Sequence, residues 1–200
     1  MGVCCIATKY PIDAKVKVLT LKNNSWRQIQ GVDNSVVGSI YGLGTLSNNA
    51  LHWIGEQDFN YFIVSFDLSG GERFKELGLP DHLAKERFLV NLGTIGDSLV
   101  IFCYLEATLS FKSWVMKEYG VKSSWTRLFR VSNDTFPYFN FGVTLKCITK
   151  QGKVVLQIDG SELILYSPEE EPYKEFGFKN YWGRFESVVY EESLVSLNGQ

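Results

Sequence analysis

The sequence predicts an all-β, antiparallel fold arranged as a β-propeller-like set of blades, and three observations support this prediction. Aromatic residues make up 14% of the 200 residues, and aromatic and β-branched residues favour strands. Helical periodicity is almost absent along the chain. Short apolar runs recur about every ten residues with no helix between them, which favours a sandwich, barrel or propeller over a parallel sheet with crossover helices.

The expected strands follow one another along the chain and are separated by glycine or asparagine turns. The clearest pair meets across Asp159-Gly160, which is a strong hairpin signal. A short helical turn is expected only after Pro80, where Asp81 can cap residues 81–87. The acidic run 167–172 is typical of a solvated loop. The expected strands cover residues 3–7, 16–18, 26–29, 51–54, 61–66, 99–104, 114–116, 125–129, 154–158 and 163–166.

A repeated pattern divides the chain into roughly four blade-like units. In each unit a polar turn separates two strands, and an aromatic residue opens the second of them. The pattern recurs about every 40 to 50 residues, which is the blade spacing of a propeller. About four blades is the lower limit for a closed ring, so the sequence predicts one propeller-like domain over residues 1–200 and leaves open both a closed ring and an incomplete propeller. Closing strands are expected at 24–29, 74–77, 123–128 and 173–176.

Charge and composition argue against several classes of function. The formal net charge is −2, so there is no electrostatic basis for binding nucleic acid. No run of about 18 apolar residues predicts a membrane span, and for residues 2–7 a core strand is favoured over an acylation site. The cysteines lack the Cys-x-x-Cys spacing of a zinc site, so no metal or cofactor is expected. Free thiols suit the cytoplasm or the nucleus.

No catalytic residue is predicted, and the chain is expected not to be an enzyme. His52 lies within an apolar strand and His82 in a loop, and neither has the partners of a Ser-His-Asp triad. The glycines of residues 38–44 lack the ending of a phosphate-binding loop and are expected to be turn residues. Asp58, Asp67 and Glu72 have the chemistry of a glycosidase acid pair. Asp67 fits better as the cap of a turn at a strand end, and Glu72 as a solvated charge at the start of the next strand.

Two aromatic stretches between strands are the candidate partner-binding segments. Tyr138 and Phe139 lie in the first, and Tyr181, Trp182 and Arg184 in the second. Trp, Tyr and Arg in exposed loops are the residue types that dominate protein interfaces. These five residues are therefore predicted to contact a protein target, whereas most other aromatic residues are expected to pack between blades.

Several stretches taken together resemble the plant F-box-associated domain. Their order and spacing are more specific than any one of them, and the resemblance runs from about Val16 to Leu197. We take Trp26, Trp53, Asp67, Trp114 and Trp125 as structural motif residues of the repeat and of this resemblance. The stretches are Leu51–Ile54, Ile63–Leu68, Glu72–Phe74, Leu79-Pro80, Trp114–Val121, Ser124–Thr126 and Tyr190–Leu197.

The resemblance implies a propeller-like domain of plant F-box proteins, including those called F-box/kelch-repeat proteins. In that family an N-terminal F-box docks on the Skp-type subunit of a cullin ubiquitin ligase, and the associated domain selects the protein to be ubiquitinated. No amphipathic helical run precedes Val16, so the Skp-type subunit is expected to bind only through an F-box missing from this chain. The family's usual Asn-Gly turn before Leu51 is here Asn48-Asn49, and asparagine tolerates the positive φ that such a turn needs.

Two hypotheses about function follow. The first is a non-enzymatic module that binds a target protein and recruits it for ubiquitination. The alternative is an aromatic-rich β-sandwich that binds carbohydrate, because the face of a Trp or Tyr ring stacks on sugars. Four-strand repetition would favour the first hypothesis, and a two-layer sandwich the second.

Overall fold

The computed structural model of this chain describes residues 3–6, 17–20, 24–29, 40–57, 60–69, 73–81, 83, 88–105, 110–132, 143–149, 151–167, 174–179 and 183–187. These residues form strands, turns and one short 3₁₀ helix, Lys122–Ser124. The chain divides into two compact units, residues 1–134 and 135–200. Within the described ranges, no helix has the length and apolar content that a membrane crossing requires.

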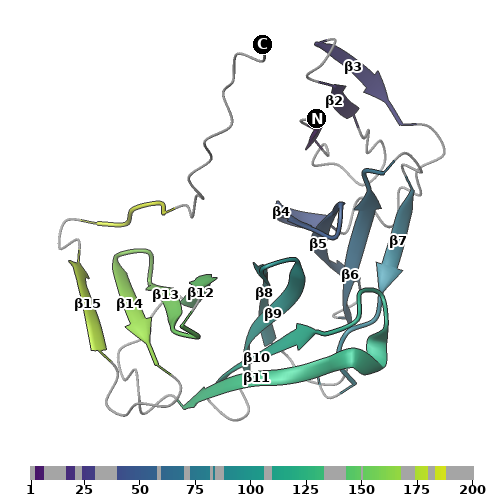
Figure 1. Ribbon diagram of the computed structural model, residues 1–200. Helices are drawn as coiled ribbons and strands as arrows, with labels where there is room; N and C mark the ends of the chain where they lie inside the picture. Colours follow the sequence, from purple (N-terminus) through teal and green to yellow (C-terminus); the bar gives the residue numbers. More distant parts are fainter. Residues whose placement is uncertain are drawn as a thin grey trace. The chain divides into compact units, whose positions relative to one another are not determined.

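The described strands form four antiparallel sheets, and in each sheet the strands lie side by side in chain order (Figure 1). Sheet 1 contains β1 (Val3–Ile6), β2 (Lys17–Thr20) and β3 (Ser25–Gln28). Sheet 2 contains β4 (Ile40–Ser47), β5 (Ala50–Gln57), β6 (Asn60–Asp67) and β7 (Phe74–Leu77). Sheet 3 contains β8 (Phe88–Ile95), β9 (Ser98–Leu105), β10 (Ser110–Met116) and β11 (Trp125–Ser132). Sheet 4, in the second unit, contains β12 (Val143–Ile148), β13 (Val154–Ile158), β14 (Glu162–Tyr166) and β15 (Lys174–Lys179).

The predicted repeat is confirmed, because each predicted closing strand is the last strand of a sheet. Register places Thr20 opposite Ser25, Phe66 opposite Phe74, Met116 opposite Trp125 and Leu165 opposite Lys174. The all-β, antiparallel, propeller-type fold class is therefore confirmed as well. Repetition of four-stranded sheets is the observation that favours the protein-binding hypothesis over the carbohydrate-binding sandwich.

The hairpin turn between β4 and β5 has the backbone that the sequence predicts. Asn48 and Asn49 both have positive φ, 48° and 56°, and they join β4 to β5 with Ser47 opposite Ala50. Positive φ at both central residues gives a turn whose twist matches that of the strands, and asparagine adopts this conformation at low cost. The turn therefore survives without the family's usual glycine.

The prediction that the glycines of residues 38–44 are turn residues is wrong for Gly44, which lies inside β4. A Cβ at Gly44 would lie 2.9 Å from Cε2 of Trp53, because the indole ring lies directly over the glycine. Gly55 in β5 gives the same room to Phe62, whose Cε2 would lie 2.5 Å from a Cβ there. A glycine inside a strand marks such a close approach. Here the glycines allow aromatic rings to lie flat on the sheet.

The expected helical turn after Pro80 is present only as a single turn in the described residues. The Leu83 amide donates to the carbonyl oxygen of Pro80 at 2.9 Å, and Leu83 is buried at 1% exposure. The remaining part of the predicted turn, residues 84–87, lies outside the described residues. Asp81 makes an ion pair with Lys122.

Sheets 2 and 3 pack face to face in the first unit and share one hydrophobic core. β4 and β5 both contact β8. Burial of each aliphatic or aromatic side chain of this kind contributes about 1.5–3 kcal/mol, so the two sheets form one cooperative body. The shared core consists of Ile54, Ile63, Leu77, Leu79, Leu83, Leu99, Ile101, Cys103, Leu105, Trp114 and Met116, with Tyr61, Leu92 and Trp125 packed against it.

Candidate protein-binding surface

Of the five predicted contact residues, the structure places one. Arg184 lies in the coil segment 183–187 and is exposed. Tyr138, Phe139, Tyr181 and Trp182 lie outside the described residues. The site can therefore be built only around Arg184 and the strands that hold its segment.

A buried glutamine holds this segment against sheet 4. Gln157 on β13 is only 5% exposed, and its Nε2 donates to the carbonyl oxygen of Phe185 at 2.7 Å and to that of Gly160 at 3.2 Å. Its Oε1 accepts from Oγ of Ser187 at 2.9 Å. The Phe185 amide also donates to the Gly160 carbonyl oxygen, at 2.7 Å. The side-chain amide of Gln157 thus makes the hydrogen bonds that attach the segment 183–187 to β13. In a sheet, the backbone of a neighbouring strand would make such bonds.

Arg184 crosses the β13–β14 turn. A Cβ at Gly160 would lie 3.2 Å from Cγ of Arg184, and Gly160 has φ of 72°, so this turn provides both the conformation and the space that the arginine stem needs.

Lys146 on β12 donates from Nζ to the Ser187 carbonyl oxygen at 3.2 Å. Burial lowers the pKa of Lys146, and the nearby Glu186 carboxylate opposes that shift. An exposed guanidinium on a segment fixed at three points is suited to binding, because little freedom is lost on contact.

Sequence reasoning identified Arg184 but missed Gln157. The signal was present, because Gln157 is the one polar residue in the apolar strand Val154–Ile158. A buried polar side chain must find hydrogen-bond partners, and a strand neighbour cannot satisfy a whole amide. Such a residue therefore indicates that another segment packs there.

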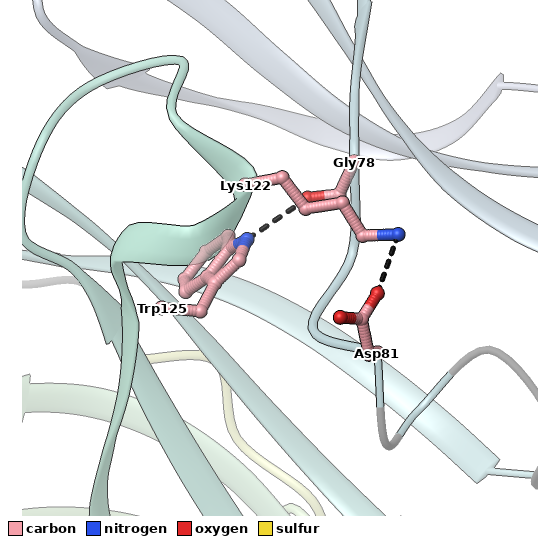
Figure 2. A network of polar contacts seen from close by, with 4 residues as sticks. All are labelled: Gly78, Asp81, Lys122 and Trp125. Carbon is pink, nitrogen blue, oxygen red and sulfur yellow. Dashed lines mark hydrogen bonds and ion pairs between the residues drawn. The ribbon is translucent and has the colours of Figure 1, made fainter.

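The loop between β10 and β11 joins sheets 2 and 3. Nε1 of Trp125 donates to the carbonyl oxygen of Gly78 at 2.9 Å, and Nζ of Lys122 lies 2.7 Å from Oδ1 of Asp81 (Figure 2). The Lys122 stem passes over Gly78, since a Cβ there would lie 2.7 Å from its Cδ. Tyr119 and Val121 of the same loop are 40% and 41% exposed. The loop thus has one face on the core and one face in solvent.

His52 is the second link between the two sheets and is not an accessible base. It is completely buried, with Nδ1 3.1 Å from the carbonyl oxygen of Thr45 and Nε2 2.9 Å from the hydroxyl of Tyr119. A carbonyl oxygen only accepts, so Nδ1 carries the proton and Nε2 accepts from the Tyr119 hydroxyl. Burial lowers the pKa of His52, which keeps the ring neutral in this arrangement.

The structure places Asp67 at the end of β6, in a turn. The hydroxyl and the backbone amide of Ser69 both donate to Oδ1 of Asp67, at 2.5 and 2.7 Å. These hydrogen bonds, the hydroxyl first, lower the pKa of Asp67. The carboxylate is therefore occupied in shaping the turn. In the described part of the chain, no cluster of three or more His, Cys, Asp or Glu side chains has the geometry to hold a metal ion.

The four tryptophans of the predicted structural motif have different environments. Trp114 on β10 is 5% exposed, and Trp53 and Trp125 are half-buried. Trp26 on β3 is 50% exposed. It is therefore an exception to the prediction that most aromatic residues pack between blades. All four residues of β3 are exposed, so the position of Trp26 in the repeat does not bury it.

Comparison with known proteins decides the family. The model of the F-box associated beta propeller domain matches residues 3–197. The chain belongs to this family. Among its relatives, F-box protein CPR1 of Arabidopsis thaliana is 28% identical over 198 residues, covering 90% of this chain and 47% of that protein. The Arabidopsis F-box/kelch-repeat protein At3g23880 is 25% identical over 198 residues, covering 98% of this chain and 52% of that protein.

This F-box associated domain spans about half the length of the relatives it matches. A third Arabidopsis relative, F-box protein At4g22390, is 29% identical over 173 residues, with 79% of this chain and 42% of that protein covered. Two stretches of the family resemblance, Trp114–Val121 and Ser124–Thr126, contain the buried Trp114 and most of the loop that joins sheets 2 and 3. In this domain these stretches therefore hold two blades together.

Proposed function

We propose that this chain is the substrate-recognition module of an F-box protein in a Skp–cullin–F-box ubiquitin ligase. It binds a target protein, and a separate F-box binds the Skp-type subunit. The observation that supports this proposal most strongly is the match of the F-box associated beta propeller family over residues 3–197. The single domain over residues 1–200 that the sequence predicts is part of the same proposal.

The mechanism is presentation, without bond chemistry. Sheet 4 supports the segment 183–187 through the hydrogen bonds of Gln157, and loops on such a support can hold side chains in fixed positions for a partner. Arg184, fixed over the β13–β14 turn, is the described residue with these properties. We extend the contact surface to Tyr181 and Trp182, which precede Arg184 in the sequence, and to the first aromatic stretch, at Tyr138 and Phe139.

Target binding is tested by capturing proteins from plant extract with the purified chain. We expect Trp182→Ala and Arg184→Ala each to lose a defined set of captured proteins while retaining the melting temperature of the parent. Arg73→Ala is the matched control, because Arg73 is an exposed arginine of the first unit. If the parent and the Trp182→Ala, Arg184→Ala double variant capture the same set of proteins, these two residues do not belong to the binding site.

The ligase role is tested with the same chain joined behind an F-box. We expect this fusion to shorten the half-life of a captured protein in plant cells, and inhibition of cullin activation to restore it. The same fusion with Trp182→Ala and Arg184→Ala should leave the half-life long. An unchanged half-life with the parent fusion would contradict the proposed function.

A separate experiment tests whether the F-box alone, and not this chain, binds the Skp-type subunit. We expect the purified chain not to bind the Skp-type subunit, and the fusion to bind it, because the described residues contain strands and no α-helix to serve as an F-box. Tight binding by the unfused chain would show that the propeller domain itself contacts the ligase.

A further inference from the structure

The last strand of sheet 3, β11, is longer than the last strands of the other three sheets. β11 has 8 residues, whereas β3 and β7 have 4 each and β15 has 6. The strand order β11-β10-β9-β8 places it at the edge of the sheet (Figure 1). Among the described strands it pairs only with β10. One row of its backbone N–H and C=O groups therefore points away from the sheet, as at any edge strand.

Three cations share one face at this edge. Lys112 of β10 lies opposite Arg130 of β11, and Trp114 lies opposite Arg127. Opposite residues in an antiparallel pair share a face, and so do alternate residues of one strand. Lys112, Arg127 and Arg130 therefore project from the same side of sheet 3.

These charges are not neutralised within the sheet. The four strands of sheet 3 contain no Asp or Glu, and the described contacts give none of the three cations an ion pair or a side-chain hydrogen bond. Like charges directly opposite each other on two strands are destabilising. Lys112 opposite Arg130 therefore costs stability that an external anion would restore.

Protection of the sheet edge against aggregation does not explain why all three cations, Lys112, Arg127 and Arg130, lie on one face. A charge on an edge strand does discourage unwanted pairing, and Arg127 and Arg130 are both exposed on β11. Lys112, however, lies on the inner neighbour β10 and is half-buried, so it adds repulsion without guarding the edge. Leu128, which is 38% exposed, adds an apolar contact point on the same strand.

We propose that β11 binds an extended acidic segment of a partner protein, which adds a strand to the edge of sheet 3. The partner's backbone would pair with the free row of β11, and its carboxylates would lie beside Lys112, Arg127 and Arg130. Main-chain hydrogen bonds provide affinity in strand addition, and side-chain contacts on alternate residues provide specificity. The inference rests on the proposed function and names an acidic segment as the class of sequence that the module recognises.

An extended peptide fits this surface better than nucleic acid does. The chain as a whole carries a net charge of −2, which opposes a long polyanion, whereas the cations of sheet 3 form one short row. A phosphate backbone also cannot hydrogen-bond in register with a strand edge. Both points can be measured.

The test uses the complete chain and a synthetic ten-residue peptide of alternating glutamate and valine carrying a fluorescent label. Binding is followed by fluorescence anisotropy at increasing salt concentration. We expect saturable binding that weakens as salt screens the charges. The Arg127→Glu, Arg130→Glu double variant should bind at least about tenfold more weakly, since like charges now face the peptide.

Three controls separate strand addition from simple attraction. Arg73→Glu, at an exposed arginine that immediately precedes β7, should change the affinity less than about twofold. A peptide of the same sequence, N-methylated on every backbone nitrogen, should bind about tenfold more weakly because neither of its edges can donate hydrogen bonds to β11. Arg127→Gln with Arg130→Gln gives an intermediate loss if the reversed variant folds poorly, and circular dichroism reports folding of each variant.

The proposal is overturned by equal binding of the two peptides, by unchanged affinity in both double variants, or by single-stranded DNA binding as tightly as the peptide. Failure of peptide binding while the chain still captures its plant proteins would overturn the acidic-segment inference and leave the proposed function standing. Peptide binding with no change in the half-life of captured proteins would overturn the proposed function and leave the strand-addition site standing.

Discussion

Two chain segments are fixed against a sheet by different means. The β10–β11 loop, residues 117–124, is fixed by large side chains at its ends, because Trp125 packs on the core of sheets 2 and 3 and Tyr119 reaches the buried His52. The segment 183–187 is fixed by the single amide of Gln157 and by backbone hydrogen bonds. The first attachment combines apolar packing of Trp125 with polar contacts, and the second is almost entirely polar.

The difference shows how the two attachments should fail. Loss of an apolar contact removes buried area that two sheets share, so the cost falls on the whole first unit. Loss of the Gln157 side-chain amide leaves the buried polar groups that it contacts without hydrogen-bond partners. The free-energy cost is lowest if the segment 183–187 detaches, because water can then hydrogen-bond to those groups. Four measurements separate these outcomes, from the largest expected effect to the smallest.

Trp125→Ala should have the largest effect, lowering the free energy of unfolding by about 3 kcal/mol, the lower end of the range for a buried aromatic residue, because Trp125 is half-buried. Both the packing against the core and the hydrogen bond to Gly78 are lost. Denaturant unfolding measures the change. Trp26→Ala is the control, and it should cost less than about 1 kcal/mol because Trp26 is 50% exposed. A loss below about 1 kcal/mol for Trp125→Ala would show that Trp125 is not part of the core.

Gln157→Leu should cost about 1 to 3 kcal/mol, because the carbonyl groups of Gly160 and Phe185 lose a donor in a buried site. We expect the loss to be local. Hydrogen exchange should accelerate at the Phe185 amide while the strands of sheets 2 and 3 keep their protection. Gln57→Leu, at an exposed position on β5, should leave exchange unchanged. Uniform acceleration across both units would contradict a local attachment.

His52 should make stability depend on pH below its ordinary pKa of 6.5. Burial lowers the pKa of the folded side chain, so the unfolded chain takes up a proton that the folded chain resists. Stability should therefore fall as pH drops through 6.5 and stay level above it.

Denaturant midpoints between about pH 7.5 and about pH 5.5 measure this dependence. His52→Gln should lower the denaturant midpoint at every pH and make the midpoint depend less on pH. His82→Gln should leave the pH dependence of the midpoint unchanged. An unchanged slope in His52→Gln would mean that another group is responsible.

The Lys122–Asp81 ion pair should have the smallest effect. Both side chains are largely exposed, at 51% and 84%, and exposed pairs contribute less than about 1 kcal/mol. Lys122→Met keeps the stem over Gly78 and should change the unfolding free energy by less than about 0.5 kcal/mol. Lys122→Gly, which also removes the stem, should cost more. If the two variants were equal, the stem would not contribute to the attachment.

Much of the fold could be predicted because it depends on local signals. Alternating apolar residues and positive-φ turn residues such as Asn48 and Asn49 act over a few positions, so the strands and the four-unit repeat were accessible from the sequence. The role of Gly44 was not accessible, because it depends on the ring of Trp53 from the neighbouring strand. The exposure of Trp26 was missed for a similar reason, since a repeat fixes a position in a blade and burial depends on what packs against that blade.

By itself the sequence determined most of the strands, the closing strand of each sheet and the family resemblance, because these depend on residue type and spacing along the chain. The strands β4, β8 and β12, which open sheets 2, 3 and 4, were not among the expected strands. The tertiary structure alone decided that His52 is a buried link, that Gln157 holds residues 183–187, and that Lys112 faces Arg130. Each of these contacts joins residues from different strands or loops. Pairing register and packing create them, and neither is written in any single stretch of the chain.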